Sequence, residues 1–292
     1  MRVLILGITG MLGSTAFRIL SRRGDHEVFG LARQHAARAW FPDFKADRIL
    51  TGIDVTDRDR LAAAADRIRP DVVINAVGII KQIDAALDPL IAIPVNAELP
   101  HRLAVLCERI GARLIHVSTD CVFSGDTGRY REEDRPDAAD LYGLSKYLGE
   151  VDKPHALTLR TSIIGPELET SYGLVEWFLA QRASARGYAR AVFSGLTSVE
   201  LTRAIADYAI PRPDLHGLYH VAAEPIAKHD LLELLRDEYG HPIVIDRVAE
   251  PTIDRSLDGG RFRAATGYVA PAWPDMIRIM HAFDERHQGP TA

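Results

Sequence analysis

The first thirteen residues constrain the fold of this chain more than any other stretch. An apolar run at residues 3–6 breaks at Gly7 and passes into a Gly-x-x-Gly-x-x-Gly turn, after which apolar residues recur with helical spacing. This order predicts a buried strand, a tight turn and a helix. Gly7 lets the chain leave the strand sharply, Gly10 leaves room for a pyrophosphate, and Gly13 lets the helix pack closely. The helix N-terminus then offers amide groups and a positive dipole end to phosphate.

Strands and helices alternate over the first half of the chain, and this predicts the fold class. Further strands are expected at residues 27–33, 47–52, 71–78, 113–120 and 156–160, with helices between them at 61–68, 89–109 and 141–150. Such alternation indicates an α/β fold, a Rossmann-type doubly wound parallel sheet covered on both faces.

The pattern changes after Gly165-Pro166, which predicts a second unit. Helices at 174–182, 201–210 and 228–239 alternate with short strands near 218–221 and 243–245. We therefore expect an NADP(H)-binding Rossmann domain over residues 1–164 and a smaller C-terminal α/β substrate-binding lobe over 165–285. Part of the sheet domain can also be formed by residues within 165–285. A disordered tail is expected over 286–292.

Composition excludes several classes of function. The formal net charge is −5 and there is no run of lysines or arginines, so nucleic acid is not an expected partner. We see no apolar run of the roughly 20 residues that a membrane helix needs, and the chain starts on a core strand, so a cytoplasmic protein is expected. The two cysteines, Cys107 and Cys121, suit reduced thiols, and no histidine pair has helical metal-binding spacing, so no metal is expected.

The ends of the strands predict how a nucleotide is bound. An acidic residue after the second strand would accept hydrogen bonds from both ribose hydroxyls, but this chain has Ala32 and then Arg33. Arg33 can pair with a 2′-phosphate, which favours NADP(H) over NAD(H); a solvated arginine is the alternative. At the third strand end, the carboxylate of Asp54-Val55 can meet the adenine amino group. The fourth strand ends in a small-residue turn, 75–78, at the same edge of the sheet.

A tyrosine and a lysine four residues apart carry the candidate chemistry. Tyr142 and Lys146 lie on one face of a predicted helix. A tyrosine has a reference pKa of about 10, and a cationic lysine beside it should bring that pKa closer to neutral, which makes a usable general acid or base. Thr119, at the end of the fifth strand, can hydrogen-bond the same substrate oxygen. With a nicotinamide, these groups suffice for ketone reduction or alcohol oxidation.

These motifs together resemble the extended short-chain dehydrogenase/reductases over nearly the whole chain, and within them the dTDP-4-dehydrorhamnose reductase branch. The resemblance is carried by Gly7-x-x-Gly10-x-x-Gly13, Asn75-Ala76, Asn96, Ser118-Thr119-Asp120, Val122-Phe123, Tyr142-x-x-x-Lys146 and Leu159-Arg160-Thr161-Ser162. It implies catalytic roles for Thr119, Tyr142 and Lys146, with Asn96 holding the active-site helix and a water. The implied cofactor contacts are Gly7, Thr9, Gly10, Met11, Leu12, Gly13, Arg33, Asp54, Val55, Asn75, Ala76, Val77, Gly78, Tyr142, Lys146, Thr161, Ser162 and Ile163.

The resemblance also implies the substrate class, nucleotide-linked 4-keto-6-deoxy sugars reduced at carbon 4 by hydride from NADPH and a proton from Tyr142. The expected substrate contacts are Lys81, Thr119, Asp120, Cys121, Tyr142 and Arg255. Arg255 stands where related enzymes reach the substrate diphosphate, with a surface arginine as the alternative. Cys121 replaces a usual aromatic residue of the branch, and the turn after Asn75 departs from its alanine-rich version, so the sugar and nucleotide stay open. Trp177 and Phe178 can stack a base, but core packing is favoured.

Two other functions stay open at this stage. One is an epimerase with tightly bound cofactor, although such enzymes usually prefer NAD with an acidic ribose-binding residue, which Ala32-Arg33 lacks. The other is a non-catalytic NADP-binding regulatory subunit, since the same fold serves as the regulatory partner of methionine adenosyltransferase; fold alone does not decide function. The oligomeric state stays open, and a homodimer, which is common in the family, is one possibility.

Overall fold

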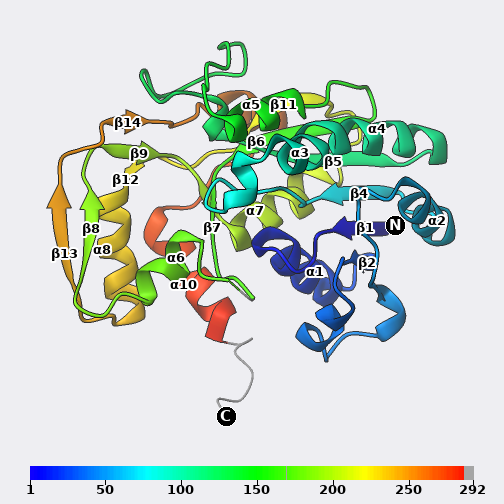
Figure 1. Ribbon diagram of the computed structural model, residues 1–292, viewed down its shortest axis with the longest axis horizontal. Helices are drawn as coiled ribbons and strands as arrows, with labels where there is room; N and C mark the ends of the chain where they lie inside the picture. Colours follow the sequence, from blue (N-terminus) through cyan, green and yellow to red (C-terminus); the bar gives the residue numbers. More distant parts are fainter. Residues whose placement is uncertain (169, 286–292) are drawn as a thin grey trace.

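A seven-stranded parallel sheet organises the computed structural model, which describes residues 1–168 and 170–285 (Figure 1). Its order is β11-β6-β5-β4-β1-β2-β3, and every pairing is parallel. The strands are β1 Arg2–Leu6, β2 Glu27–Leu31, β3 Ile49–Leu50, β4 Val72–Asn75, β5 Arg113–Thr119, β6 Ala156–Thr161 and β11 Gly217–His220. The chain builds β1 to β3 in one direction and β4 onward in the other, so the order reverses between β1 and β4. Open α/β sheets bind ligands at such a switch point, beyond the carboxyl ends of the strands.

Helices cover both faces of this sheet, as the alternation predicts. The helices are α1 Met11–Arg23, α2 Arg58–Ile68, α3 Pro89–Ala92, α4 Leu99–Ile110, α5 Leu141–Leu148, α6 Leu174–Leu179, α7 Ser198–Ala204, α8 Lys228–Tyr239, α9 Gly260–Thr266 and α10 Trp273–Glu285. One core includes Phe17 of α1 and Leu201 of α7. The other includes Leu61 of α2 and Leu103 of α4. Because both faces are covered, strands such as β4 and β6 are buried throughout and rich in apolar residues.

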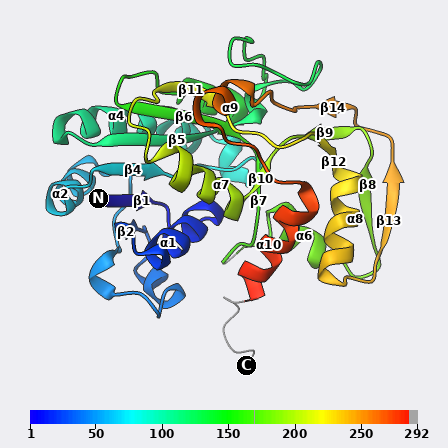
Figure 2. The same cartoon turned by 180° about the vertical axis from the view of Figure 1, so that it is seen from behind.

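The C-terminal half contributes both to this sheet and to a smaller unit. The remaining strands are β7 Ile163–Ile164, β8 Ser184–Tyr188, β9 Ala191–Phe193, β10 Leu196–Thr197, β12 Ile226–Ala227, β13 Val244–Val248 and β14 Ile253–Asp254. Of these, β8, β9, β12, β13 and β14 gather with α8 at one end of the molecule, toward which the β1 and β4 arrowheads point (Figures 1 and 2). The strand expected near 218–221 is β11, which pairs with β6 in the large sheet. The predicted tail at 286–292 lies outside the described residues.

Most predicted elements differ from the structure by a few residues at their ends, and two of these differences have a clear physical cause. The third strand, expected over 47–52, is only β3, because a 3₁₀ turn, Ala46–Arg48, precedes it and Gly52 turns the chain with a φ of 76°. The helix expected over 201–210 begins earlier, at Ser198, because the Thr197 side chain caps it by accepting from the Glu200 amide. Its second half, Ile205–Ala209, is π-helical.

The expectation that no apolar stretch is long enough to cross a membrane was wrong. By length and composition the continuous helix Pro89–Ile110 qualifies, with 44% of its apolar window buried. It comprises α3, the π-helical η4 Ile93–Glu98 and α4. Leu99, Leu103 and Cys107 are buried in the core on one face of the sheet, so in this structure the stretch is a core helix of the α/β unit.

Candidate active site

The glycine-rich turn has the geometry expected of a phosphate site. Gly7 adopts a φ of 80° directly after β1, and Gly10 is the N-cap residue of α1. A Cβ on Gly13 would collide with the Gly7 carbonyl oxygen, whereas one on Gly10 would only touch it, at 3.4 Å. Internal packing thus requires glycine at position 13 but not at 10, where open space is what a pyrophosphate needs. Thr9, Met11 and Leu12 lie in the same turn and at the start of α1, whose first turn carries no acidic residue.

Asparagine side chains hold the turn after β4 at both ends. At its start, Asn75 Oδ1 accepts a hydrogen bond from the Val77 amide at 3.1 Å. At its end, buried Asn96 exchanges two hydrogen bonds with the Ile79 backbone, at 2.8 and 3.1 Å. The Asn96 amide also donates to Ser145 Oγ of α5 at 3.2 Å. Asn96 therefore ties this turn, which includes Ala76 and Gly78, to the helix that carries Tyr142 and Lys146.

The candidate catalytic side chains meet where β5 ends. Thr119 is the last residue of β5 and its side chain interacts with the Tyr142 hydroxyl. Asp140 begins α5 by accepting a hydrogen bond from the Gly143 amide at 2.9 Å. This cap places Tyr142 in the first turn of α5, against the end of the strand.

Lys146 follows Tyr142 one helical turn later and is almost fully buried. Its Nζ donates to the Val117 carbonyl oxygen at 2.8 Å, and a Cβ on Gly78 would lie 3.9 Å from the same nitrogen. Lys146 thus joins β5 to the turn after β4. The expected nicotinamide contacts Thr161, Ser162 and Ile163 follow at the end of β6, where Thr161 is the register partner of Thr119.

The electrostatics of this pair differ from the sequence-based expectation. Burial raises the pKa of Tyr142, the neighbouring Cys121 raises it further, and the Thr119 side chain lowers it in part. Burial also lowers the pKa of Lys146 to about 8, against a smaller raising effect of Glu150. The expected lowering of the tyrosine pKa is therefore not found, because burial, which disfavours the phenolate, is the largest effect on this group. At neutral pH the site holds a protonated tyrosine and a largely protonated lysine.

A buried ion pair behind α5 was not foreseen as part of the site. The Arg160 guanidinium of β6 donates to both oxygens of Glu150 at 2.6 Å, and Ser118 donates to Glu150 at 2.8 Å. The two charged side chains are 2% and 10% exposed, so water hardly screens them. The pair fixes the end of α5 to β5 and β6. Ser118 and Arg160 belong to the motifs that carry the resemblance, but no role was predicted for either residue from the sequence.

Cationic side chains surround Asp120 on the expected substrate side. Lys81 Nζ lies 2.6 Å from Asp140, and Arg255 Nε donates to the Phe123 carbonyl oxygen at 2.8 Å. Arg255 and Lys228 both act on the charge of buried Asp120, whose pKa is nevertheless raised by burial. Lys228, the first residue of α8, was missed from the sequence because it is distant along the chain. Cys121 follows Asp120, and burial raises the pKa of its thiol to about 12.

The residues expected at the adenosine end also lie together. Arg33 is exposed directly after β2 and close enough to Asp54 to lower the pKa of that carboxyl. The larger cause of this lowering is Thr56, whose hydroxyl and amide donate to Asp54 Oδ1 at 2.6 and 2.9 Å. Val55 lies between them. Of the two aromatic candidates, Phe178 is fully buried and Trp177 is 36% exposed.

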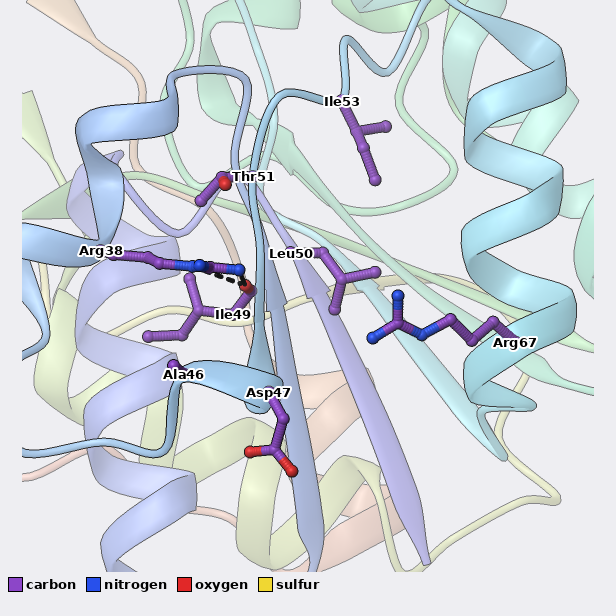
Figure 3. Close-up of a pocket in the computed structure, with 8 residues that line it drawn as sticks. All are labelled: Arg38, Ala46, Asp47, Ile49, Leu50, Thr51, Ile53 and Arg67. Atoms are coloured by element: carbon purple, nitrogen blue, oxygen red, sulfur yellow. Dashed lines mark hydrogen bonds between the residues drawn. The ribbon is translucent and has the colours of Figure 1, made fainter.

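A small cavity of about 160 Å³ lies at the edge of β3 (Figure 3). Arg38 donates to the Ile49 carbonyl oxygen there, at 3.3 and 3.4 Å, and so covers part of the exposed strand edge. The lining residues are Arg38, Ala46, Asp47, Ile49, Leu50, Thr51, Ile53 and Arg67. None of them is a predicted site residue, although Ile53 directly precedes Asp54.

A histidine and two carboxylates on α8 could hold a metal by position. His229, Asp230 and Glu233 bring their ligand atoms within 4.8 Å of one another. Arg247 Nη1 lies 3.2 Å from His229 Nδ1 and 3.7 Å from Asp230. The Arg247 guanidinium therefore already offsets part of the negative charge of this cluster.

Comparison with known proteins gives one family. The family model described as "RmlD substrate binding domain" matches residues 1–243. A dTDP-4-dehydrorhamnose reductase from Aggregatibacter actinomycetemcomitans is 26% identical over 97% of this chain and 99% of its own length. A probable low-salt glycan biosynthesis reductase, Agl14, from Haloferax volcanii is 34% identical over 63% of this chain and 61% of its own length. This chain thus spans less than two thirds of that relative.

Solved structures share the fold. A dTDP-4-dehydrorhamnose reductase from Bacillus anthracis in complex with NADP has a TM-score of 0.79 at 21% identity, covering 97% of this chain and 99% of that one. The Bordetella bronchiseptica enzyme WbmG in complex with NAD has a TM-score of 0.75 at 22% identity, covering 98% and 94%. At these identities the likeness shows the fold alone, a Rossmann-type α/β sheet.

Proposed function

Because this chain belongs to the RmlD substrate binding domain family, whose model matches residues 1–243, we propose that it reduces the 4-keto group of a nucleotide-linked 4-keto-6-deoxy sugar with NADPH, in deoxysugar biosynthesis. The observation that carries the proposal is the meeting of Thr119, Tyr142 and Lys146 at the sheet edge that presents the glycine-rich turn. The name of the Aggregatibacter relative supports the same reaction class.

The chain's own residues fit a dinucleotide at the switch point. Gly10 leaves space over the N-terminus of α1, and the turn after β4 packs against the glycine-rich turn, since a Cβ on Gly7 would lie 2.9 Å from Val77 Cγ2. Lys146 adjoins this second turn and is placed to bind a ribose hydroxyl. When bound, the reduced nicotinamide supplies the hydride.

Tyr142 acts as the general acid in the proposed reaction. Its hydroxyl is protonated at neutral pH, because burial raises the pKa of Tyr142 above its ordinary value, so a proton is available for the ketone oxygen. Thr119 orients the ketone oxygen. The Lys146 ammonium, with a pKa of about 8, stabilises the phenolate that remains after proton transfer.

NADPH preference rests on the end of β2. Ala32 is buried and Arg33 is exposed, so this strand end presents a cation and no carboxylate. An arginine can bind a 2′-phosphate through two parallel hydrogen bonds. A carboxylate in its place would favour the free ribose hydroxyls of NADH.

The substrate diphosphate is expected at the cations near Asp120. Arg255 donates a hydrogen bond from Nε to the Phe123 carbonyl oxygen. Its two terminal nitrogens can then bind a phosphate in a bidentate contact. Lys81 and Cys121 line the expected sugar side. We further propose that the protein is a homodimer, because apolar residues on α3 and α5 are exposed: Leu90, Leu144 and Leu148. We also propose that it works in the cytoplasm, which the free thiols of Cys107 and Cys121 support.

The test is NADPH oxidation at 340 nm with dTDP-, GDP- and UDP-linked 4-keto-6-deoxy sugars in turn, with NADH beside it. Turnover with one sugar and a preference for NADPH supports the reductase. A cofactor that stays bound through turnover would indicate the epimerase. Tight NADPH binding with no sugar reduced would indicate the regulatory subunit.

A further inference from the structure

A buried histidine lies beneath the cofactor turn. His116, in the middle of β5, is fully buried and is the register partner of Asn75, the last residue of β4. Neighbouring residues in a parallel register place their side chains on the same face of the sheet. Asn75 Nδ2 lies 3.1 Å from His116 Nδ1, within hydrogen-bond distance.

This contact determines which way the Asn75 amide points. Asn75 Oδ1 accepts from the Val77 amide, so the other end of the side chain, Nδ2, can only donate. His116 Nδ1 must then accept, which places the imidazole proton on Nε2, a buried atom that has no hydrogen-bond partner among the described residues. Reversing the amide would set two donors, Nδ2 and the Val77 amide, against each other.

The position of Val77 in turn affects the glycine-rich turn, where the cofactor is proposed to bind. A Cβ built on Gly7 would lie only 2.9 Å from Val77 Cγ2. Val77 therefore packs directly against the glycine-rich turn. The far end of the same segment is fixed by Asn96 through Ile79. The two cofactor turns therefore have a defined spacing only while Asn75 keeps its orientation.

We propose that His116 is a positioning residue for cofactor binding: by accepting the Asn75 amide hydrogen, it fixes the turn at residues 75–79 against the glycine-rich turn. Burial holds the pKa of His116 well below its ordinary value, and Lys146 of α5 and His101 of α4 lower it further. The ring is thus neutral and can accept at Nδ1 throughout the physiological range.

The tautomer can be measured on the unaltered protein. Long-range ¹H–¹⁵N correlation spectra of the ¹⁵N-histidine-labelled chain, with His116 assigned by its loss in His116→Asn, should show an unprotonated Nδ1 and a protonated Nε2. A proton on Nδ1, or a doubly protonated ring at pH 7, would overturn the proposal.

Cofactor affinity provides the functional test, which rests on the proposed function because NADPH is the probe. His116→Leu removes the acceptor and should weaken NADPH binding about tenfold, or about 1.4 kcal/mol, the scale of one buried hydrogen bond. His116→Asn keeps an oxygen at the Nδ1 position and should stay within about threefold of wild type. In turnover, His116→Leu should raise the KM for NADPH while kcat is kept.

Leu114→Ala, a buried change two residues earlier on β5, controls for general loss of stability. It should destabilise the fold without weakening NADPH binding. Equal affinity of wild type and His116→Leu, or equal weakening by Leu114→Ala, would refute the positioning role. If wild type itself failed to bind NADPH, the proposed function would fail instead, and the tautomer measurement would still decide the hydrogen-bond arrangement.

Discussion

Replacing Lys146 by methionine tests the electrostatics of the site without any substrate. Burial lowers the pKa of Lys146 from 10.5 to about 8 in the folded chain. Between these values the unfolded chain binds more protons than the folded one, so the free energy of unfolding of the wild type rises with pH. The cost of the buried charge is full below pH 8 and fades above it. The two pKa values, at 1.36 kcal/mol per unit, give wild type a gain of about 2 kcal/mol between pH 7 and 9.5 that Lys146→Met lacks.

The assay is urea unfolding followed by tryptophan fluorescence at pH 7 and 9.5. The methionine variant also loses the hydrogen bond to Val117, worth about 1 kcal/mol, so its absolute stability at one pH is not informative. The change with pH is informative, because groups common to both chains cancel. Lys153→Met, at an exposed lysine, is the matched control and should show no such change. The reasoning would be refuted if the free energies of unfolding of Lys146→Met and wild type differed by the same amount at both pH values.

Three further substitutions test separate parts of the site. Arg33→Ala should lower the ratio of kcat/KM for NADPH over NADH by about tenfold or more, because a charge-assisted phosphate contact of about 1.5–3 kcal/mol is lost; an unchanged ratio would contradict the 2′-phosphate role. Gly13→Ala should abolish NADPH binding measured by fluorescence, because the added Cβ collides with the Gly7 carbonyl oxygen. Arg160→Met should lower the free energy of unfolding by about 3–5 kcal/mol, since it leaves Glu150 buried without its partner; adding Glu150→Gln should restore part of this loss.

The fold and the family could be predicted because strong local signals carry them. The glycine-rich turn, buried strands and helical periodicity occur in an order that few folds satisfy. The α/β sheet and the resemblance to the dTDP-4-dehydrorhamnose reductase branch are confirmed. The positions of Thr119, Tyr142 and Lys146 follow from strand ends and helix spacing. Their catalytic roles stay predictions.

The features that sequence reasoning missed depend on packing between distant segments. The direction of the Tyr142 pKa shift is set by burial, which helix spacing cannot reveal. Lys228 reaches Asp120 only through the placement of the C-terminal strands. The edge strand β3 has two residues, whereas the sequence predicted six. It is short because a 3₁₀ turn, Ala46–Arg48, precedes it and Gly52 turns the chain after it.

Transfer of a deuterium label tests the central claim most directly. NADPH carrying deuterium at the transferred C4 position is incubated with the purified chain and the accepted nucleotide-linked 4-keto-6-deoxy sugar, and the product is examined by NMR. The account predicts one deuterium at sugar carbon 4, formed by wild type and lost by at least about a hundredfold in rate in Tyr142→Phe, which should still bind NADPH. Deuterium retained on the cofactor, or a Tyr142→Phe variant that transfers it at the wild-type rate, would contradict the account.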